Sequence, residues 1–321
     1  MRPNRRTLLQ IGLTAAFVGG WRGAAPAAET PAAAATIGSV EQIAPGVFVH
    51  RGAHGVYTPG NLGDISNNGF IVGGDAVAVI DTGGTAAVGK RLRDAIRKVT
   101  AKPVRYVVNT HMHPDHVLGN AAFRGDSPSF IGHHKLAAAL SARAERYLAY
   151  NRAEVGEAGF AGTEIVLPDV AVEQTLDLDL GGGRVLRLEA QRTAHTDNDL
   201  TVRDMTTDTV FLGDLVFAEH VPTIDGSIRG WMALLEAMSK VPAARIVPGH
   251  GPAAMPWPAA AVPLQRYLDA VASDVRKAIR DGRTLSETTT TAARGERDKW
   301  ELFDGFHARN VSAAFAELEW E

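Results

Sequence analysis

Three histidines and one aspartate lie within the six residues from His111 to His116, in the segment NTHMHPDH at 109–116. An apolar stretch typical of a strand precedes this segment, and a helical pattern follows it. His111 and His113 are two residues apart on a loop, so both rings can turn to one metal ion, whereas Asp115 and His116 can face a second. Neutral imidazole and carboxylate are good ligands for zinc and also for iron. A polar surface turn rarely gathers four such residues, so the segment predicts a metal site.

Three more candidate ligands, His195, Asp214 and His250, follow predicted strands further along the chain. A single histidine after a strand is more often structural than a metal ligand. Here, however, four strand ends deliver ligand residues, and sites in α/β folds usually lie at such ends. We therefore predict one metal centre built by His111, His113, Asp115, His116, His195, Asp214 and His250.

Strand and helix patterns alternate along the chain, which predicts an α/β fold. Val88, Leu92 and Ile96 have the spacing of one helix face, whereas short apolar runs such as 104–109 have the length of strands. Strands are predicted at 47–50, 69–72, 76–81, 104–109, 129–132, 185–189, 200–203, 209–212 and 245–247, and helices at 87–99, 135–158, 230–240, 263–279 and 312–318.

The first 27 residues read as a removable export signal, with a charged start, a short apolar middle and a small-residue cleavage site at Ala25-Pro26-Ala27. Arg5-Arg6, followed by two leucines, resembles a twin-arginine signal, which predicts a periplasmic protein. An ordinary secretory signal and a disordered N-terminus are the alternatives. We expect residues 28–40 to form a linker. Removal of 1–27 deletes four arginines and no acidic residue, which moves the formal charge from −3 to −7.

Composition excludes several classes of function. A mildly acidic mature chain offers no electrostatic footprint for nucleic acid and argues against a polybasic membrane-surface role. After the N-terminus, no apolar run is long enough to span a bilayer. The chain contains no cysteine, so disulfides, a cysteine nucleophile and thiolate metal ligands are all excluded.

The ligand pattern His-x-His-x-Asp-His, then His, Asp and His, resembles that of the metallo-β-lactamase fold superfamily over residues 40 to 255. The resemblance implies an αββα sandwich domain at 41–255, with a C-terminal helical extension at 256–321 packed on it. It also implies two zinc ions bridged by Asp214. Asp81, in Asp81-Thr82-Gly83, matches the family's early turn and would orient the site, a plain turn aspartate being the alternative. The first ion would be held by His111, His113 and His195, and the second by Asp115, His116 and His250.

More closely, the chain resembles the SoxH-related, or quinoprotein relay system, zinc metallohydrolases. That branch is exported and is associated with quinoprotein dehydrogenases that use pyrroloquinoline quinone, so the resemblance implies such a system as a partner. Asp214 stands where some β-lactamases carry cysteine or serine, which favours thioesterase-, lactonase- or glyoxalase II-like hydrolases. His113 in place of glutamate argues against a flavin-partnered di-iron protein. The matching stretches are 43–50, 63–65, 68–72, 109–120, 213–217 with His220, and 310–321.

This pattern predicts a hydrolase in which two metals activate a water toward a thioester, a lactone or a similar electrophile. Asp115 would combine ligation with proton handling. The alternatives are a mononuclear iron persulfide dioxygenase, a non-catalytic metal-binding relay protein and a periplasmic β-lactamase. We expect a small-molecule substrate in a pocket built by loops 52–68 and 218–230 and the C-terminal helices, with Tyr57 and His220 near it, and Arg146 on a solvated helix face. The sequence leaves open the substrate, the native metal (zinc, iron or manganese), the oligomeric state and the cleavage site.

Overall fold

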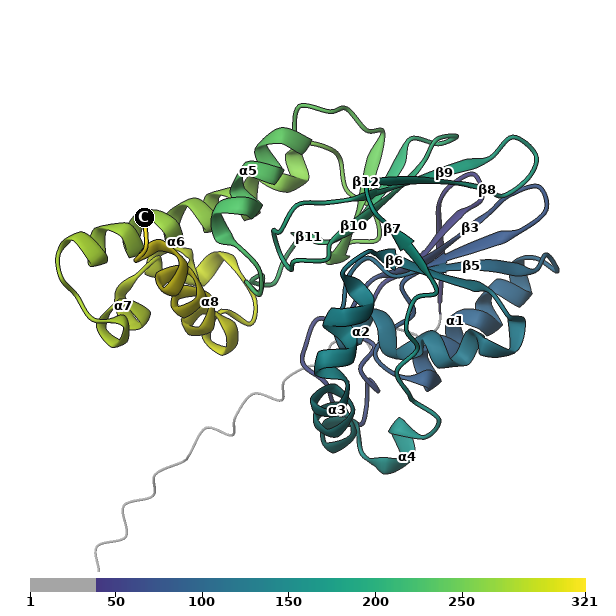
Figure 1. Cartoon of the computed structure of the whole chain (residues 1–321), viewed down its shortest axis with the longest axis horizontal. Helices are drawn as coiled ribbons and strands as arrows, with labels where there is room; N and C mark the ends of the chain where they lie inside the picture. Colours follow the sequence, from purple (N-terminus) through teal and green to yellow (C-terminus); the bar gives the residue numbers. More distant parts are fainter. Residues whose placement is uncertain (1–38) are drawn as a thin grey trace, which may run out of the picture. The chain divides into compact units, whose positions relative to one another are not determined.

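A computed structural model of the chain describes residues 39–321. The predicted signal at 1–27 and nearly all of the predicted linker lie outside the described residues. Within the described part, two sheets pack face to face and helices cover their outer faces (Figure 1). This helix–sheet–sheet–helix layering confirms the predicted αββα sandwich.

The first sheet has seven strands, in the order β1-β2-β3-β4-β5-β6-β7. Strands β1 to β4 are antiparallel to their neighbours, and β4 to β7 are parallel. Parallel neighbours need a crossover connection, which α1 (Ala86–Val99) supplies between β4 and β5. The strands are β1 (Glu41–Ala44), β2 (Val47–His50), β3 (Asn68–Val72), β4 (Val77–Ile80), β5 (Val104–Val108), β6 (Ser129–His133) and β7 (Val170–Val172).

The second sheet has five strands, in the order β12-β11-β10-β9-β8. Strands β8 to β11 form an antiparallel meander, and β12 lies parallel to β11 at the edge. Helix α5 (Ile228–Met238) makes the crossover between β11 and β12. The strands are β8 (Thr175–Asp179), β9 (Val185–Ala190), β10 (Leu200–Asp204), β11 (Thr209–Phe217) and β12 (Arg245–His250).

The inner faces of the two sheets share one apolar core. Ile71 and Val108 of the first sheet meet Leu186, Val202 and Phe211 of the second there, and all five side chains are buried. Complete burial of one such side chain stabilises a protein by roughly 1.5–3 kcal/mol. This core therefore holds together the two sheets from which the candidate ligands come.

The outer faces are covered by amphipathic helices. Helix α1 begins after Thr85, whose side chain accepts a hydrogen bond from the N–H of Val88. It buries Leu92 and Ile96 against the first sheet. On the other side, α5 buries Trp231, whose indole N–H donates to the carbonyl of Leu215 at 3.0 Å. The helical spacing in the sequence therefore predicted the two helices, α1 and α5, that cover the outer faces of the sheets.

The C-terminal region consists of helices α6 (Val262–Arg280), α7 (Leu285–Thr291) and α8 (Phe303–Leu318). These helices share the apolar core of α5. Helix α8 begins nine residues before its predicted start. Helix α7 was not predicted, because four consecutive threonines have weak helix propensity, yet the capping box of Thr284 and Glu287 stabilises its first turn.

Other differences from the predicted elements lie at sheet edges and around the ligand loop. Strands β1, β7 and β8 were not predicted; β8 alternates leucine with aspartate and is mostly solvent-facing. Strand β11 continues to Phe217, so Asp214 lies inside the strand and not after it. The remaining helices are α2 (Pro114–Val117), a 3-10 helix (Leu118–Asp126), α3 (Leu136–Val155) and α4 (Glu157–Phe160), with shorter 3-10 turns at Ala259–Ala261 and Arg294–Lys299.

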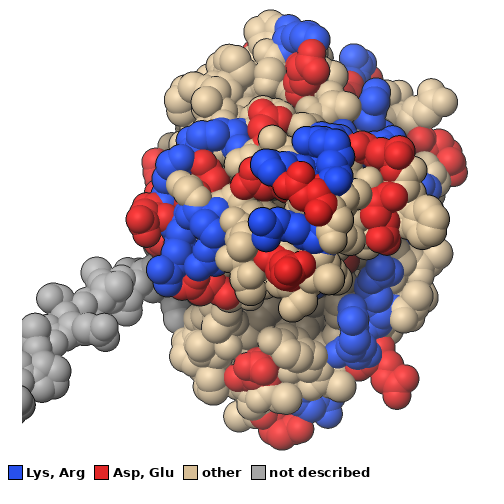
Figure 2. Space-filling model, turned by 90° about the vertical axis from the view of Figure 1, so that its left-hand side faces the viewer, with Lys and Arg blue, Asp and Glu red and all other residues tan. Residues whose placement is uncertain are grey.

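The surface carries charges of both signs. Acidic and basic side chains are interspersed over the face shown in Figure 2. Within residues 39–321, no helix combines the length and the apolar character that crossing a membrane requires.

Candidate metal centre

All seven predicted ligands come together where the two sheets meet at one end of the sandwich. His111 and His113 lie on the loop after β5, and Asp115 and His116 lie in α2. The other three come from the second sheet: His195 follows β9, Asp214 lies in β11, and His250 ends β12. The seven donors form two groups whose ligand atoms lie within 4.8 Å of one another.

Two glycines let β11 and β12 approach closely enough to present Asp214. Gly213 has a φ of 51°, in the left-handed region that favours glycine, and the pairing of β11 with β12 is irregular at this point. A Cβ atom at Gly249 would lie 1.9 Å from Oδ1 of Asp214. A Cβ atom at Gly213 would lie 2.6 Å from Oγ1 of Thr110, so a side chain at Gly213 would displace Thr110 and one at Gly249 would displace the carboxylate.

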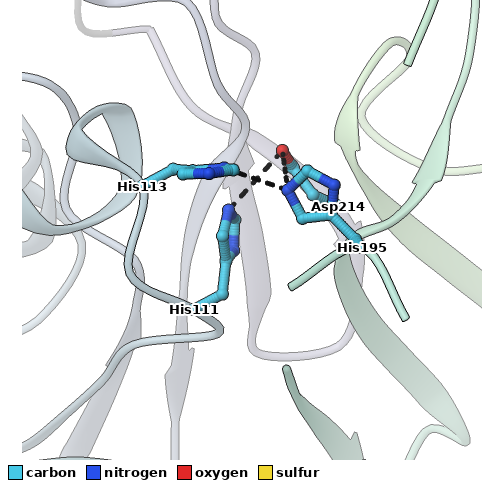
Figure 3. Close-up of side chains that lie close together, drawn as sticks. All are labelled: His111, His113, His195 and Asp214. Carbon is cyan, nitrogen blue, oxygen red and sulfur yellow. Dashed lines mark hydrogen bonds and ion pairs between the residues drawn. The ribbon is translucent and has the colours of Figure 1, made fainter. Parts of the chain in front are cut away.

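The first group contains His111, His113, His195 and Asp214 (Figure 3). Oδ2 of Asp214 lies 3.3 Å from Nε2 of His195 and 3.6 Å from Nε2 of His111. Nδ1 of His113 lies 3.0 Å from Nε2 of His195. Three imidazoles and one carboxylate therefore converge on one point.

The second group contains Asp115, His116 and His250. Oδ2 of Asp115 lies 3.3 Å from Nε2 of His250 and 3.5 Å from Nε2 of His116. Oδ1 of Asp214, the oxygen that faces away from the first group, lies 3.1 Å from His116 and 3.4 Å from His250. The two oxygens of Asp214 thus face different groups.

Each of the five histidines donates its other ring nitrogen to a fixed acceptor. Nδ1 of His195 donates to the carbonyl of Thr223 at 2.8 Å, and Nδ1 of His250 to that of Ile65 at 2.9 Å. Carbonyl oxygens only accept, so these contacts fix the tautomer and leave Nε2 free for a metal. The remaining donations run from His111 Nδ1 to Thr110 Oγ1 (3.1 Å), from His113 Nε2 to Asp225 Oδ2 (3.1 Å) and from His116 Nδ1 to Asp81 Oδ2 (2.8 Å).

The donor atoms fit divalent metal ions. Nε2 of His111, Nε2 of His116 and Oδ1 of Asp214 are buried and have no hydrogen-bond partner among the described residues, a costly arrangement that bound cations would relieve. Burial lowers the pKa of His111 well below its ordinary value, which keeps that ring neutral as ligation requires. Burial alone would also lower the pKa of His116 and His250, but the Asp214 and Asp115 carboxylates outweigh it and raise both, so these two rings lose a proton when they bind a metal. Burial alone would raise the pKa of Asp115, but His116 and His250 outweigh it and lower that pKa to about 2. The carboxylate is therefore ionised and available.

Asp81 lies directly behind the ligands. Its carboxylate accepts hydrogen bonds from the N–H and the hydroxyl of Thr110, at 2.8 and 2.7 Å, in addition to the one from His116. Because Thr110 in turn accepts from His111, one carboxylate orients a ligand of each group. Asp81 has a φ of 55°, so it occupies a tight left-handed turn as well.

A cavity of about 480 Å³ opens beside the two groups. His113, Asp115, Asp214 and His250 lie in its wall. That volume is typical of sites for small molecules. It therefore gives a substrate access to the metal centre.

Tyr57 and His220, both expected near the substrate, line this cavity. The hydroxyl of Tyr57 is buried and has no hydrogen-bond partner within residues 39–321. Burial, reinforced by the Asp115 carboxylate, raises the pKa of Tyr57 well above its ordinary value. His220 is buried, donates Nδ1–H to the carbonyl of Val221 at 2.8 Å and packs its ring 4.6 Å from that of His250.

Several residues that contribute to the site were not predicted. Asp225 holds His113 and lies in the loop 218–230, which the sequence indicated only as a pocket segment. Helix α3 forms a further wall of the cavity through Arg146, Tyr147, Tyr150 and Asn151. Arg146 is exposed on α3, as predicted, but it also lines the cavity, because the approach of α3 to the cavity depends on packing between distant segments.

Comparisons with known proteins agree with this geometry. A family model described as the metallo-beta-lactamase superfamily matches residues 62–250, more than half of the chain. Among curated proteins, a linear primary-alkylsulfatase from Pseudomonas sp. (strain ATCC 19151) is 35% identical over 49 residues. That match covers 15% of this chain and only 9% of the sulfatase.

Solved structures share the fold at low sequence identity. TMB-1 superposes with a TM-score of 0.55 and 20% identity, over 72% of this chain and 96% of that one. The metallo-beta-lactamase from Pontibacter korlensis superposes with a TM-score of 0.56 and 20% identity, over 72% of this chain and 98% of that one. The metallo-beta-lactamase from Hirschia baltica superposes with a TM-score of 0.52 and 17% identity, over 67% of this chain and 90% of that one.

The family model spans the segment that supplies all seven ligands, from His111 to His250. Fold, ligand order and donor geometry therefore agree with one another. The chain belongs to the metallo-beta-lactamase superfamily, with the fold and the donor set of its metal-dependent hydrolases.

Proposed function

We propose that the protein is a two-zinc hydrolase that cleaves a thioester, a lactone or a related electrophile with an activated water. The observation that carries this proposal is the division of the Asp214 carboxylate, one oxygen toward each donor group. A mononuclear iron centre, as in a persulfide dioxygenase, would leave the group of Asp115, His116 and His250 without purpose.

When bound, two divalent ions supply a water of lowered pKa and stabilise negative charge that develops on the substrate. The protein positions the ligands and provides an apolar wall that excludes water from them. Phe217 stacks on His250, with ring centroids 4.9 Å apart, and also lies against His195. Because this ring borders the cavity, it limits bulk water around the ligands.

Two residues on the cavity wall are placed to handle protons. Asp115 is ionised, and its carboxylate accepts a proton from the attacking water and returns it to the leaving group. Tyr57 offers a buried hydroxyl without a partner among the described residues. A phenol with an ordinary pKa of about 10 keeps its proton at neutral pH, so Tyr57 donates a hydrogen bond to the substrate oxygen that becomes negative.

We also propose that the enzyme is exported as a folded protein by its Arg5-Arg6 segment, after which residues 1–27 are removed, and that it serves a quinoprotein dehydrogenase system. The resemblance at 43–50, 68–72 and 310–321 to the quinoprotein relay branch supports this placement. We assign 41–255 to the catalytic domain and 256–321 to a helical extension.

Metal analysis by mass spectrometry of the purified protein, combined with a panel of thioesters, lactones, sulfate esters and nitrocefin, tests the proposal. Two zinc ions per chain, with turnover of a thioester or lactone, are expected. Iron together with oxygen uptake on glutathione persulfide would replace the proposal by the dioxygenase. Nitrocefin hydrolysis would identify a β-lactamase, and full metal occupancy without any turnover would leave a binding protein.

A further inference from the structure

The cavity beside the metal centre has a wall that the family model does not cover. Leu302, Phe306 and Arg309 line it from the start of α8, whereas the family match ends at residue 250. Opposite the ligand loops, α3 contributes Arg146 and Tyr150. The start of α8, beyond the residues that the family model matches, therefore completes the pocket together with α3.

Arg146 and Arg309 are the basic side chains of the cavity wall. Arg146 is exposed and makes no ion pair with any of residues 39–321. Arg309 has a single carboxylate neighbour, Oδ1 of Asp225 at 3.7 Å, and its side chain is 64% exposed. The same Asp225 carboxylate already accepts a hydrogen bond from His113. Neither guanidinium is therefore fully compensated by the protein.

Two arginines on the neighbouring C-terminal elements differ in this respect. Arg276 forms two hydrogen bonds of 2.7 Å to Glu321, and Arg297 pairs with Asp304. Both are satisfied within the fold, although Arg297 is exposed to solvent and Arg276 is half-buried. The two pocket arginines keep donors available toward the cavity, and the guanidinium group binds carboxylate, sulfate and phosphate groups in a two-pronged manner.

The rest of this wall is apolar and aromatic. Val56 and Tyr150 line the cavity and are 52% and 56% exposed, so they offer apolar surface on which a ligand can pack. Deeper in the wall, the amide of Asn151 donates to the carbonyl of Tyr147 at 2.8 Å. Its Oδ1 is buried without a partner among the described residues, so it offers an acceptor to a polar group of the ligand.

We propose that the enzyme selects substrates that carry an anionic group on an apolar body, with Arg146 and Arg309 holding the anion at the cavity wall. The apolar body packs between α3 and the start of α8, and the reacting bond lies at the metal centre. The C-terminal helical extension is thus a specificity element. This inference rests on the proposed hydrolase function, but its anion site can be tested separately.

Two thioesters that differ only in charge test the proposal: S-phenylacetyl thioglycolate and its neutral carboxamide. We expect the zinc-loaded wild-type enzyme to prefer the acid by about tenfold in kcat/KM, as one charge-assisted contact predicts. Arg309→Ala and Arg146→Ala should each remove most of that preference by raising KM for the acid, with the amide unaffected. Arg143→Ala, on α3 outside the cavity wall, is the matched control and should behave as the wild type.

Equal rates for the acid and the amide in the wild type would overturn the proposal. So would an equal loss on both substrates in the arginine variants, because that result indicates a structural role. Calorimetric titration of the zinc-loaded protein with 3-phenylpropionate and 3-phenylpropionamide serves if no substrate is cleaved. Weaker binding of the acid alone to the two variants supports the anion site even where the hydrolase function fails, and unchanged affinity places the carboxylate on the metals and refutes the site.

Discussion

Nδ1 of His116 donates a hydrogen bond to the carboxylate of Asp81 over 2.8 Å. The same carboxylate accepts a hydrogen bond from the hydroxyl of Thr110, which in turn accepts one from His111. Asp81 therefore orients one histidine of each donor group. We predict that Asp81→Asn lowers zinc affinity by about 10- to 100-fold, because the amide cannot accept all three hydrogen bonds. Competition with a zinc-binding dye measures this change, and unaltered affinity would contradict the assignment.

Within residues 39–321, Asp214 is the residue whose two oxygens face both donor groups. Asp214→Asn is therefore expected to leave at most one bound metal per chain and to lower kcat by about 100-fold or more, the order expected when a catalytic charge is lost. Metal content by mass spectrometry and initial rates are the measurements. Asp208→Asn, which removes an exposed carboxylate just before β11, is the control and should retain both ions. Two ions in Asp214→Asn would exclude a bridging role.

Removal of metal should destabilise the fold. Without metal, buried donor atoms of His111, His116 and Asp214 lack partners. Ligand present at about 1,000 times its dissociation constant stabilises a protein by roughly 4 kcal/mol, which in a chain of this size corresponds to a fall in Tm of about 10 °C after chelation. Differential scanning calorimetry before and after chelation, with zinc added back, checks this expectation. A Tm insensitive to chelation would speak against a metal centre.

Tyr57 should contribute to turnover and not to metal binding. Removal of its hydroxyl in Tyr57→Phe is expected to lower kcat by about 10- to 100-fold, with metal content unchanged, because one hydrogen bond to developing charge is lost. Tyr106→Phe in β5, outside the cavity wall, should leave kcat unaltered. A change confined to KM, or a loss of metal, would assign Tyr57 to binding or structure.

Glu296 gives the C-terminal helices an acid-sensitive contact. Burial would raise its pKa, but hydrogen bonds from Arg266, Lys299 and Trp300 outweigh burial and lower the pKa to about 2. A depressed pKa contributes stability above the unfolded value of about 4.3, and this contribution is lost as the pH falls toward 2. Because Arg266 and Lys299 are about half exposed, we expect roughly 1 kcal/mol after screening.

The measurement for Glu296 is denaturant unfolding between pH 6 and pH 2.5. Glu296→Gln should be less stable than the wild type at pH 6 and should lose less stability on acidification. Parallel curves for the two proteins would show that Glu296 does not report on this transition.

The sequence predicted the seven candidate ligands because four fall in one segment after the apolar strand β5, Asp214 and His250 lie in β11 and β12, and His195 lies in the loop after β9. The segment from His111 to His116 needs only local geometry, and Asp214 and His250 are placed by the neighbouring strands β11 and β12. The supporting contacts were harder to predict. Thr223 and Ile65 hold histidines through their backbone carbonyls, which any residue type provides.

The cavity wall shows the same limit. Arg146 and Tyr150 lie on α3, whose charged and apolar residues are compatible with a solvated helix. Their position at the cavity depends on packing of α3 against distant residues such as Tyr57 in the loop at 52–68, and no periodic pattern encodes such contacts. The short strands β7 and β8 were missed for a related reason, since pairing with neighbours stabilises edge strands that have little apolar character.

Ligands of both donor groups come from both sheets. The segment from His111 to His116, directly after β5 of the first sheet, contributes two ligands to each group, and the second sheet contributes His195, Asp214 and His250. A folding intermediate in which only the first sheet has formed would thus possess half of each coordination shell. Tight retention of metal would begin only when the sheets dock, at the end of maturation. Metal content would then distinguish molecules whose two sheets have docked from those in which they have not.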